Sequence, residues 1–194
     1  LNQNGKYVQE LINIIEPDFI FSKKPINRFN KIKTINIDIK KNKNEQLLKL
    51  KERISSIQNC NLMVNSKNLV MGDGDINSPI MIIGEAPGEL EDKSGYSFQG
   101  EIGSLLKKML SAINIKIDRV YSTYSINFRP PEDRKPTAQE IKRYSIFLKE
   151  HILIVDPKII ILMGSTAMQS LTGLNNKISN ERGKWKEIIL NNKT

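Results

Sequence analysis

The sequence has few of the residues that build disulfides and metal sites. Among 194 residues there is one cysteine, Cys60, and one histidine, His151. A disulfide within the chain is therefore impossible, and a Cys-rich metal or iron–sulfur site is excluded. A Cys–His catalytic pair would need both single residues in one place, and their spacing gives no reason to expect that. We expect a buried thiol at Cys60 and a surface histidine at His151.

Long apolar runs are also missing. No segment approaches the roughly 20 residues of a membrane-spanning helix. The first residues, LNQNGKYVQE, lack the basic-then-apolar order of a secretory signal. A hydrophobic content of 39% with 26% charged residues is typical of globular proteins. We therefore expect a cytoplasmic monomer without membrane contact, with a length that suits one domain or one domain plus an appendage.

Acidic residues are outnumbered, and the formal net charge is +9. The excess is uneven, because residues 1–55 carry a net +6 and residues 56–194 carry a net +3. A basic balance favours nucleic acid as a partner over an acidic substrate. The alternative is that a general bias toward Lys, Asn and Ile codons scatters lysines along the chain. Charge alone does not decide between the two.

Residues 1–55 differ from the remainder in their pattern. Helical spacing of apolar residues predicts a helix that begins at Tyr7 and stops at Pro17, and a second helix over residues 44–58. Residues 23–44 are basic, polar and without a clear period, which is typical of a linker, with short strand character at most in TINIDI. We predict a basic helical and linker appendage over residues 1–55 and a single domain over residues 56–194.

From about residue 60 onward, strand-like and helix-like segments alternate. SPIMIIG, RVYSTYSI and PKIIILMG have the apolar, β-branched character of strands, and helical patterns lie at residues 100–113, 137–155 and 165–173. This order predicts an α/β fold with a parallel sheet and helices on both faces. Ligands of such sheets bind at the carboxyl ends of the strands. The loops of interest therefore follow Ile83, Ile126 and Met163.

The first of these loops is GEAPGELEDKSGYSFQG, Gly84 to Gly100, which combines four glycines, four carboxylates and two aromatic rings. Gly84 and Gly88 allow the backbone to approach a ligand, and Pro87 stiffens the turn. The pattern is neither a Walker A motif nor G-x-G-x-x-G, and its carboxylates would repel phosphate. An acid that activates a water fits better. The alternative is a solvated acidic loop between a strand and a helix.

The second loop, NFRPPEDRKP, presents basic residues on a proline-stiffened turn. Arg129, Arg134 and Lys135 lie where the sheet would bind a ligand. Basic groups on a rigid loop suit contacts to the phosphates of nucleic acid. A turn that only improves solubility is the alternative.

Together these segments resemble the uracil-DNA glycosylase superfamily, and the family 4 type in particular. The resemblance rests on G-E-A-P-G followed by E-D-x-G-x-x-F-x-G, then R-P-P-x-x-R, DPKIIILMGSTA and ISNERGKW, and it covers roughly residues 56–190. It implies a three-layer α/β/α sandwich with a central parallel sheet of about four strands. It also implies a DNA-repair hydrolase that flips uracil out of DNA and cleaves its N-glycosidic bond.

The resemblance also implies roles for individual residues. Glu85 would orient the attacking water, and the backbone of Ala86, Pro87 and Gly88 would line the uracil pocket. Glu91 would crowd the C5 edge of uracil to exclude thymine, and Phe98 would stack on the base. The implied partner is uracil-containing DNA, single- or double-stranded, and the implied DNA contacts are Arg129, Arg134, Lys135 and Arg182.

The sequence departs from the family pattern at the iron–sulfur cluster. Family 4 proteins usually hold that cluster with four cysteines, and here only Cys60 fits one of those places. Ile57, Phe128 and Tyr144 stand at the others. The chain thus resembles a cluster-free branch, and we predict neither an iron–sulfur cluster nor another cofactor or metal. Packing around Phe128 would replace the structural role of the cluster.

Two further departures concern the chemistry. Tyr124 stands where the family has the asparagine that reads the uracil edge, and a phenol offers one hydroxyl and more bulk than an amide. We therefore expect weak uracil binding. The H-P-[ST] motif that follows R-G-x-W in the family does not occur before Thr194, so a C-terminal part would be missing and the last strand absent or reduced to KEIIL. A glycosylase, a non-catalytic DNA-binding protein and a degenerate remnant of the same fold all stay open.

Overall fold

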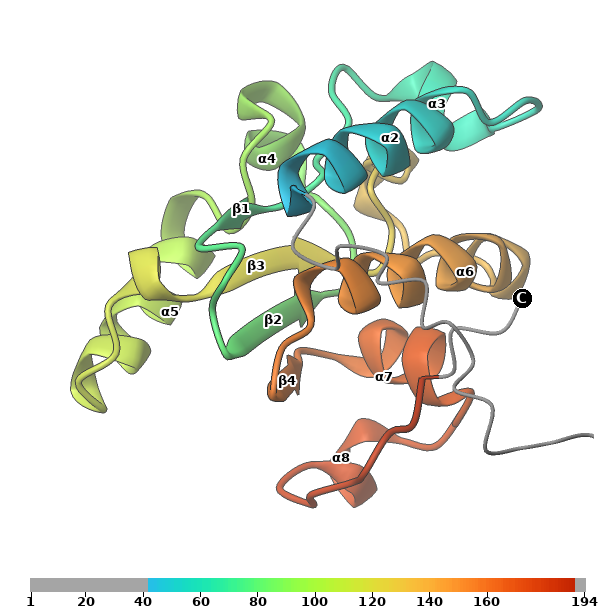
Figure 1. Cartoon of the computed structure of the whole chain (residues 1–194). Coiled ribbons are helices and arrows are strands. Elements are labelled where there is room, and N and C mark those ends of the chain that lie inside the picture. The colour runs from blue at the N-terminus through green and yellow to red at the C-terminus, as the bar shows by residue number, and fades with distance from the viewer. Residues whose placement is uncertain (1–41, 191–194) are drawn as a thin grey trace, which may run out of the picture. The chain divides into compact units, whose positions relative to one another are not determined.

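A computed structural model describes residues 42–190 (Figure 1). The predicted helix after Tyr7, most of the predicted linker and TINIDI lie outside this range. The described residues belong to one compact unit. Its elements are α2 (Lys43–Ser55), α3 (Asn61–Asn65), β1 (Asp73–Gly74), β2 (Ile80–Gly84), α4 (Glu89–Ser94), α5 (Gly100–Ala112), β3 (Tyr121–Tyr124), α6 (Ala138–Val155), β4 (Ile159–Leu162), α7 (Ser165–Thr172) and α8 (Ile178–Glu181). No helix in the described range is long and apolar enough to cross a bilayer.

The four strands form one sheet in the order β1-β3-β2-β4. β2 runs parallel to both β3 and β4, as predicted, and pairs Gly84 with Tyr124 and Ile83 with Leu162. The short strand β1 is antiparallel to β3, which the prediction of a parallel sheet missed. KEIIL, residues 186–190, forms no strand. Of the described strands only β2 pairs with β4, so β4 lies at an edge of the sheet. Ile159 and Ile161, on one face of β4, are 38% and 40% exposed.

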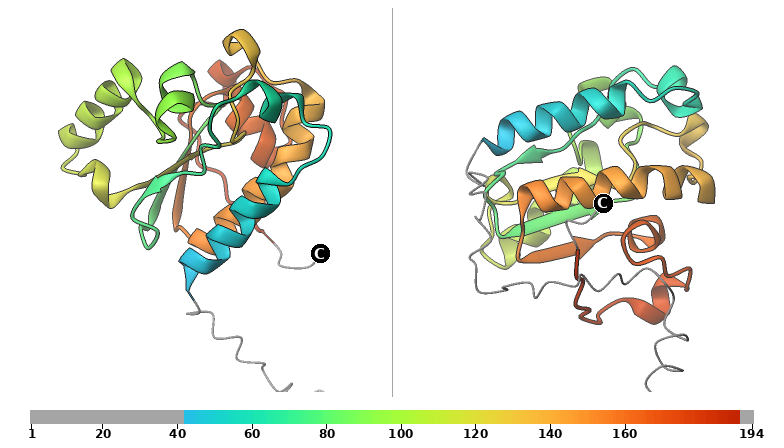
Figure 2. Two further views of the ribbon diagram at one scale, coloured as in Figure 1. Left: turned by 90° about the horizontal axis from the view of Figure 1, so that it is seen from above. Right: turned by 45° about the vertical axis from the view of Figure 1, so that its right-hand side comes forward.

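Helices cover both faces of the sheet, which confirms the three-layer α/β/α prediction. Because side chains alternate along a strand, Met81 and Ile83 pack with residues of α6 and α7, while Ile82 packs with Leu106 and Leu110 of α5. Figure 2 shows α5 and α6 on opposite sides of the sheet. The carboxyl ends of β2, β3 and β4 therefore meet at one edge between these layers.

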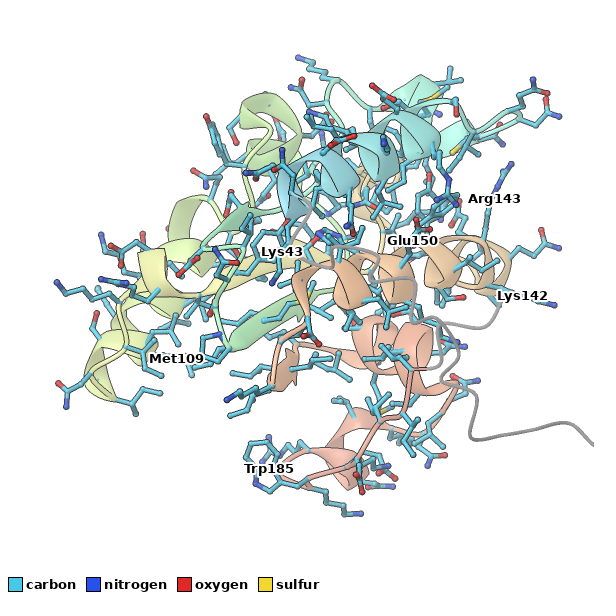
Figure 3. All side chains as sticks on the ribbon, in the orientation of Figure 1. Lys43, Met109, Lys142, Arg143, Glu150 and Trp185 are labelled. Carbon is cyan, nitrogen blue, oxygen red and sulfur yellow. The ribbon has the colours of Figure 1, made fainter. Side chains whose placement is uncertain are left out.

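α2 is part of this compact unit, although the predicted boundary assigned it to the appendage. Leu50 and Ile54 of α2 are 1% exposed and belong to a core cluster that includes residues of α6. Lys43 Nζ donates to the carbonyl of Val155 at 2.7 Å, and Arg143 Nη1 of α6 donates to the carbonyl of Asn59 at 3.0 Å. Lys43 thus ties the start of α2 to the end of α6, and Arg143 ties α6 to the segment that follows α2 (Figure 3).

The expectation of a surface histidine is wrong. His151 is 2% exposed on the inner side of α6, and its Nε2 lies 2.8 Å from the hydroxyl of Tyr121. The helical pattern was read correctly, but its apolar face is wide enough to include position 151. Burial lowers the pKa of His151 to about 4. Cys60 is buried, as expected.

Acid should therefore destabilise the domain through His151. Above pH 6.5 the imidazole is neutral in both states and contributes nothing to the pH dependence. Between about pH 6.5 and pH 4 the unfolded chain binds a proton that the folded chain does not, so stability falls through this window by roughly 3 kcal/mol. Urea unfolding at pH 7, 5.5 and 4.5 measures the loss. His151→Gln, which cannot titrate, should lose less over the same window; an identical loss in both proteins would contradict the prediction.

Candidate active site

Glu85 directly follows β2, and its carboxylate is fixed at the N-terminus of α7. Its Oε1 accepts hydrogen bonds from the backbone N–H of Thr166 at 2.8 Å and from Ser165 Oγ at 3.1 Å. Gly164 lies so close that a Cβ there would be 2.5 Å from the carboxyl carbon. No residue in the described range forms a hydrogen bond with Oε2. One oxygen is thus anchored, and the other is available to hold a water.

Ser125 fixes the backbone on which Glu85 stands. Its Oγ lies 2.7 Å from the carbonyl of Gly84 and 2.8 Å from that of Glu85, and its single hydrogen is shared between these two acceptors. Ser125 is 1% exposed, and Ala86 packs against the adjoining apolar cluster. The sequence prediction missed Ser125. The available signal was the pairing of two predicted parallel strands, which places a serine directly after β3 beside the first residues after β2.

Three consecutive backbone amides hold the second half of the first loop. Ser97 N–H donates to Asp73 Oδ2 at 2.8 Å, Phe98 N–H to the Tyr124 hydroxyl at 2.9 Å, and Gln99 N–H to a carboxylate oxygen of Glu91 at 2.8 Å. Phe98 takes φ = 47°, a left-handed conformation that is uncommon for a residue with a side chain. The three bonds hold Phe98 in this conformation, so its ring direction is set before any ligand binds. Asp73 was not predicted.

Tyr124 and Phe98 pack ring against ring at the carboxyl end of β3. Their centroids lie 5.0 Å apart with an interplanar angle of 30°. Gly84, the β2 partner of Tyr124, makes this possible, because a Cβ there would lie 2.7 Å from the Tyr124 ring. Burial, followed by the nearby carboxylates of Glu91 and Asp73, raises the pKa of Tyr124. The phenol is therefore neutral, and its oxygen already accepts the Phe98 N–H.

Glu91 is 7% exposed and joins the two ends of the loop. Its Oε2 accepts the N–H of Gly88 at 3.0 Å, while its Oε1 takes the Gln99 N–H. Both oxygens thus serve the backbone around the pocket. The implied contact between Glu91 and the C5 edge of a base stays a prediction. Pro87 and Gly88 form the turn between Glu85 and Glu91.

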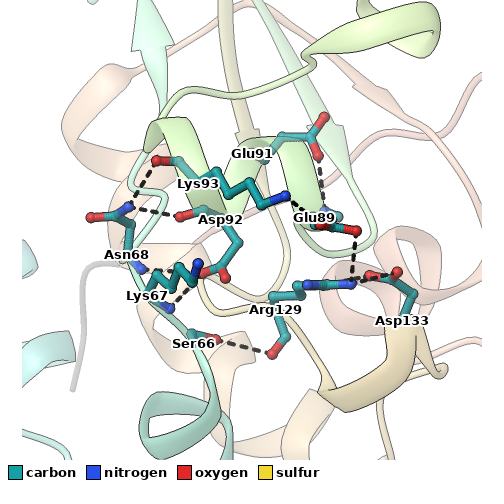
Figure 4. Close-up of polar contacts among 10 residues, drawn as sticks. Ser66, Lys67, Asn68, Glu89, Glu91, Asp92, Lys93, Arg129 and Asp133 are labelled. Atoms are coloured by element: carbon teal, nitrogen blue, oxygen red, sulfur yellow. Dashed lines mark hydrogen bonds and ion pairs between the residues drawn. The ribbon is translucent and has the colours of Figure 1, made fainter.

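Asp92 and Arg129 fasten this loop to its neighbours (Figure 4). Asp92 Oδ1 accepts the backbone N–H groups of Lys67 at 2.8 Å and Asn68 at 3.1 Å. Arg129 forms a two-pronged pair with Asp133, Nε to Oδ1 at 2.7 Å and Nη2 to Oδ2 at 2.8 Å. Its Nη2 also lies 3.9 Å from Glu89. The guanidinium of Arg129 is therefore engaged within the protein.

Of the other basic residues that the resemblance implies as DNA contacts, one is paired with a carboxylate and two are not. Arg134 forms a two-pronged pair with Glu140, at 2.9 and 2.7 Å. Lys135 is exposed beside it, and Arg182 is exposed at the end of α8, on a different segment of the chain. No described carboxylate lies within ion-pair distance of Lys135 or Arg182. Among the four basic residues implied as DNA contacts, Lys135 and Arg182 are therefore the two whose charge no described carboxylate neutralises.

The four positions that correspond to the family's cluster cysteines lie together in one apolar cluster. Cys60 Sγ is 3.2 Å from the hydroxyl of Tyr144, and the rings of Phe128 and Tyr144 meet edge to face at 6.4 Å between centroids. Ile57 packs against the same cluster. One thiol, one phenol and two hydrocarbon side chains do not supply the thiolates that an iron–sulfur cluster needs, so the residues do not fit that group.

A cavity of about 820 Å³ lies apart from the Phe98–Tyr124 pair. It runs along β4 and α7 and is closed by residues 178 and 181–188, with Ile161, Met168 and Trp185 among its lining side chains. It reaches Gly164, next to Glu85. Sequence reasoning gave no signal for it.

Comparisons with known proteins identify the family of this chain. A family model described as the uracil DNA glycosylase superfamily matches residues 71–192. The chain is 37% identical over 125 residues to a type-4 uracil-DNA glycosylase of Thermotoga maritima, covering 64% of this chain and 65% of that protein. It is 39% identical over 158 residues to the type-4 enzyme of Sulfurisphaera tokodaii, covering 75% and 72%. The corresponding protein of Pyrobaculum aerophilum is 34% identical over 137 residues, covering 71% and 70%. The matches thus span about two thirds to three quarters of these relatives.

Proposed function

The chain belongs to the uracil-DNA glycosylase superfamily, and we propose that it hydrolyses the N-glycosidic bond of a uracil flipped out of DNA. The observation that carries this proposal is the state of Glu85. One carboxylate oxygen is anchored to α7, and the other faces no donor among residues 42–190. A water bound there would be held in a fixed direction at the carboxyl edge of the sheet, where ligands of such folds bind.

The reaction needs a positioned nucleophile and a bound base. The water oxygen forms a bond to C1′ of the deoxyribose while the bond from C1′ to the uracil nitrogen breaks, and the base takes the bonding electrons. The proton that the water loses passes to the Glu85 carboxylate and from there, through solvent, to the uracil anion. Holding the water on Glu85 lowers the entropic cost of this step. The loop of Ala86, Pro87 and Gly88, with Glu91 behind it, would form the wall of the base pocket, and Phe98 is set in direction by its neighbours.

DNA would be held by its phosphates. Lys135 and Arg182 carry charge that no described carboxylate neutralises, whereas Arg129 and Arg134 would have to exchange Asp133 and Glu140 for phosphate. The net charge of +9 supports attraction to a polyanion. We propose that the protein acts as a monomer on single- or double-stranded DNA. The basic segment of residues 1–55 would add to its affinity for DNA.

The test is direct. The purified chain, in excess over single-stranded and duplex oligonucleotides that contain one uracil, should leave an abasic site that alkali converts into a strand break. Phe98→Ala, which removes the stacking ring, should abolish the break. Tyr96→Ala, two residues away and 62% exposed, is the matched control and should retain it. Intact strands after prolonged incubation with excess protein would reject the glycosylase.

A second candidate is a DNA-binding protein that no longer excises bases. The packing of Tyr124 on Phe98 favours it, because that ring lies where a base would stack. Such a protein binds DNA with no preference for uracil, and its affinity falls roughly 100-fold between about 50 and about 200 mM salt if four phosphates are contacted. Fluorescence anisotropy with matched uracil and thymine oligonucleotides distinguishes the candidates. Affinity that does not change with salt would remove the second one.

A further inference from the structure

Tyr124 and Gly84 fit each other across the β2–β3 pair. The two residues are register partners at the carboxyl ends of their strands. The ring of Tyr124 extends over the Gly84 backbone, so closely that any other residue at position 84 would collide with it. Tyr124 is 5% exposed. The space that glycine leaves open at this edge of the sheet is thus filled by a six-membered ring of the protein itself.

The hydroxyl of Tyr124 has a polar partner as well. It accepts the Phe98 N–H at 2.9 Å, and the Glu91 carboxylate is near enough to influence the phenol. A planar ring with a polar edge, stacked beside Phe98 and bonded to the loop backbone, has the features of a pyrimidine in a base pocket.

Phe98 is half-buried, and its ring contacts the ring of Tyr124. Besides its contact with Tyr124, it packs against the apolar cluster of Ile82, Leu106, Leu110 and Val120. Stacking a base needs an uncovered ring face. With Tyr124 in place, that face is occupied.

We propose that Tyr124 is a built-in occupant of the pyrimidine site, so that a flipped base reaches Phe98 only when the Tyr124 ring turns away from Gly84. This rests on the proposed function, because it assumes that the pocket receives a base. The apparent affinity for a base is then reduced by the fraction of molecules in which the ring has moved. Tyr124 would then restrict excision to bases whose flipping out of the DNA helix favours rotation of the Tyr124 ring away from Gly84.

Free small molecules test the occupancy without requiring catalysis. In Tyr124→Ala, the vacated space should bind phenol and uracil, and millimolar concentrations of each should raise the melting temperature by about 3 °C or more. Tyr124→Phe is the matched control, because it keeps the ring and loses only the hydroxyl; neither it nor the unmutated chain should respond. Equal responses in all three proteins, or none in folded Tyr124→Ala, would overturn the proposal.

A second measurement uses the unmutated chain and does not depend on the folding of Tyr124→Ala. The NMR ring signals of Tyr124, assigned by comparison with Tyr124→Phe, should move to the values of an exposed tyrosine on saturation with uracil-containing DNA but not with thymine-containing DNA. Unchanged ring signals in the uracil complex would overturn the proposal. Excision is scored separately on the unmutated chain: movement of the Tyr124 ring without cleavage of the uracil-containing DNA supports the occupancy and rejects the glycosylase.

Discussion

Replacing Glu85 by glutamine should lower the rate of uracil release at least about 100-fold, with DNA affinity changed by less than about threefold. The amide can still accept the Thr166 N–H and the Ser165 hydroxyl through its oxygen, so the local structure should be retained. What is lost is the carboxylate charge and the accepting oxygen that would hold the attacking water. Single-turnover release with excess protein measures the rate, and anisotropy measures the affinity.

Two glycine substitutions test whether the position of the Glu85 carboxylate, and not only its charge, affects the rate of uracil release. At Gly164, φ is 106° and a Cβ would lie 2.5 Å from the Glu85 carboxyl carbon, so Gly164→Ala should displace the carboxylate and slow release about tenfold or more. Gly173 also has a positive φ, 72°, but no atom lies within 4 Å of its Cβ position. Gly173→Ala therefore carries backbone strain alone. Equal slowing by both would show that strain, rather than displacement, explains the loss.

The largest loss of stability is expected from Tyr144→Ala, which should lower the free energy of unfolding by about 4 kcal/mol. Tyr144 is 1% exposed and fills the centre of the cluster formed with Cys60 and Phe128. Truncation leaves a cavity among side chains that come from separate segments and cannot easily close it. Tyr144→Phe loses only the weak contact to Cys60 Sγ and should cost about 1 kcal/mol.

Urea unfolding of these variants measures that difference. Tyr96→Ala removes the same side chain from a position that is 62% exposed and should stay within about 0.5 kcal/mol of the parent chain. A loss below about 1.5 kcal/mol for Tyr144→Ala would show that this cluster is not a main source of stability. The predicted loss would instead show that packing of this cluster holds together the segments that contribute to it.

Sequence patterns predicted what depends on neighbours along the chain. The helix over residues 137–155 is present as α6, and Thr137 Oγ1 accepts the Glu140 N–H in the capping box. The strands β2 and β4 were predicted because each is a continuous apolar run, and β3 because YSTY combines aromatic and β-branched residues. β1 was missed because two residues, Asp73 and Gly74, carry no periodicity and are defined only by their pairing with β3.

The candidate site was predictable in its residues but not in its contacts. The resemblance implied Glu85, Phe98 and Tyr124, yet the anchoring of Glu85 on α7 joins residues 80 positions apart, and no local pattern reports such a pair. In the same way, Tyr124 was expected only to replace the asparagine that reads the uracil edge, and the bond from the Phe98 N–H to its hydroxyl was not predicted. Contacts between distant segments depend on the packing of whole layers, so they emerge only with the fold.

The edge position of β4 has a practical consequence for every solution experiment. Edge strands are usually protected by charges, prolines or bulges along their length. The four residues of β4 are all aliphatic. The proline and the charge nearest to it in sequence, Pro157 and Lys158, come before its first residue. Residues 181–188 lie across the cavity beside β4, so two copies can add to each other strand by strand only when this segment moves away. Activity at nanomolar concentration and structure at millimolar concentration would then report on different species.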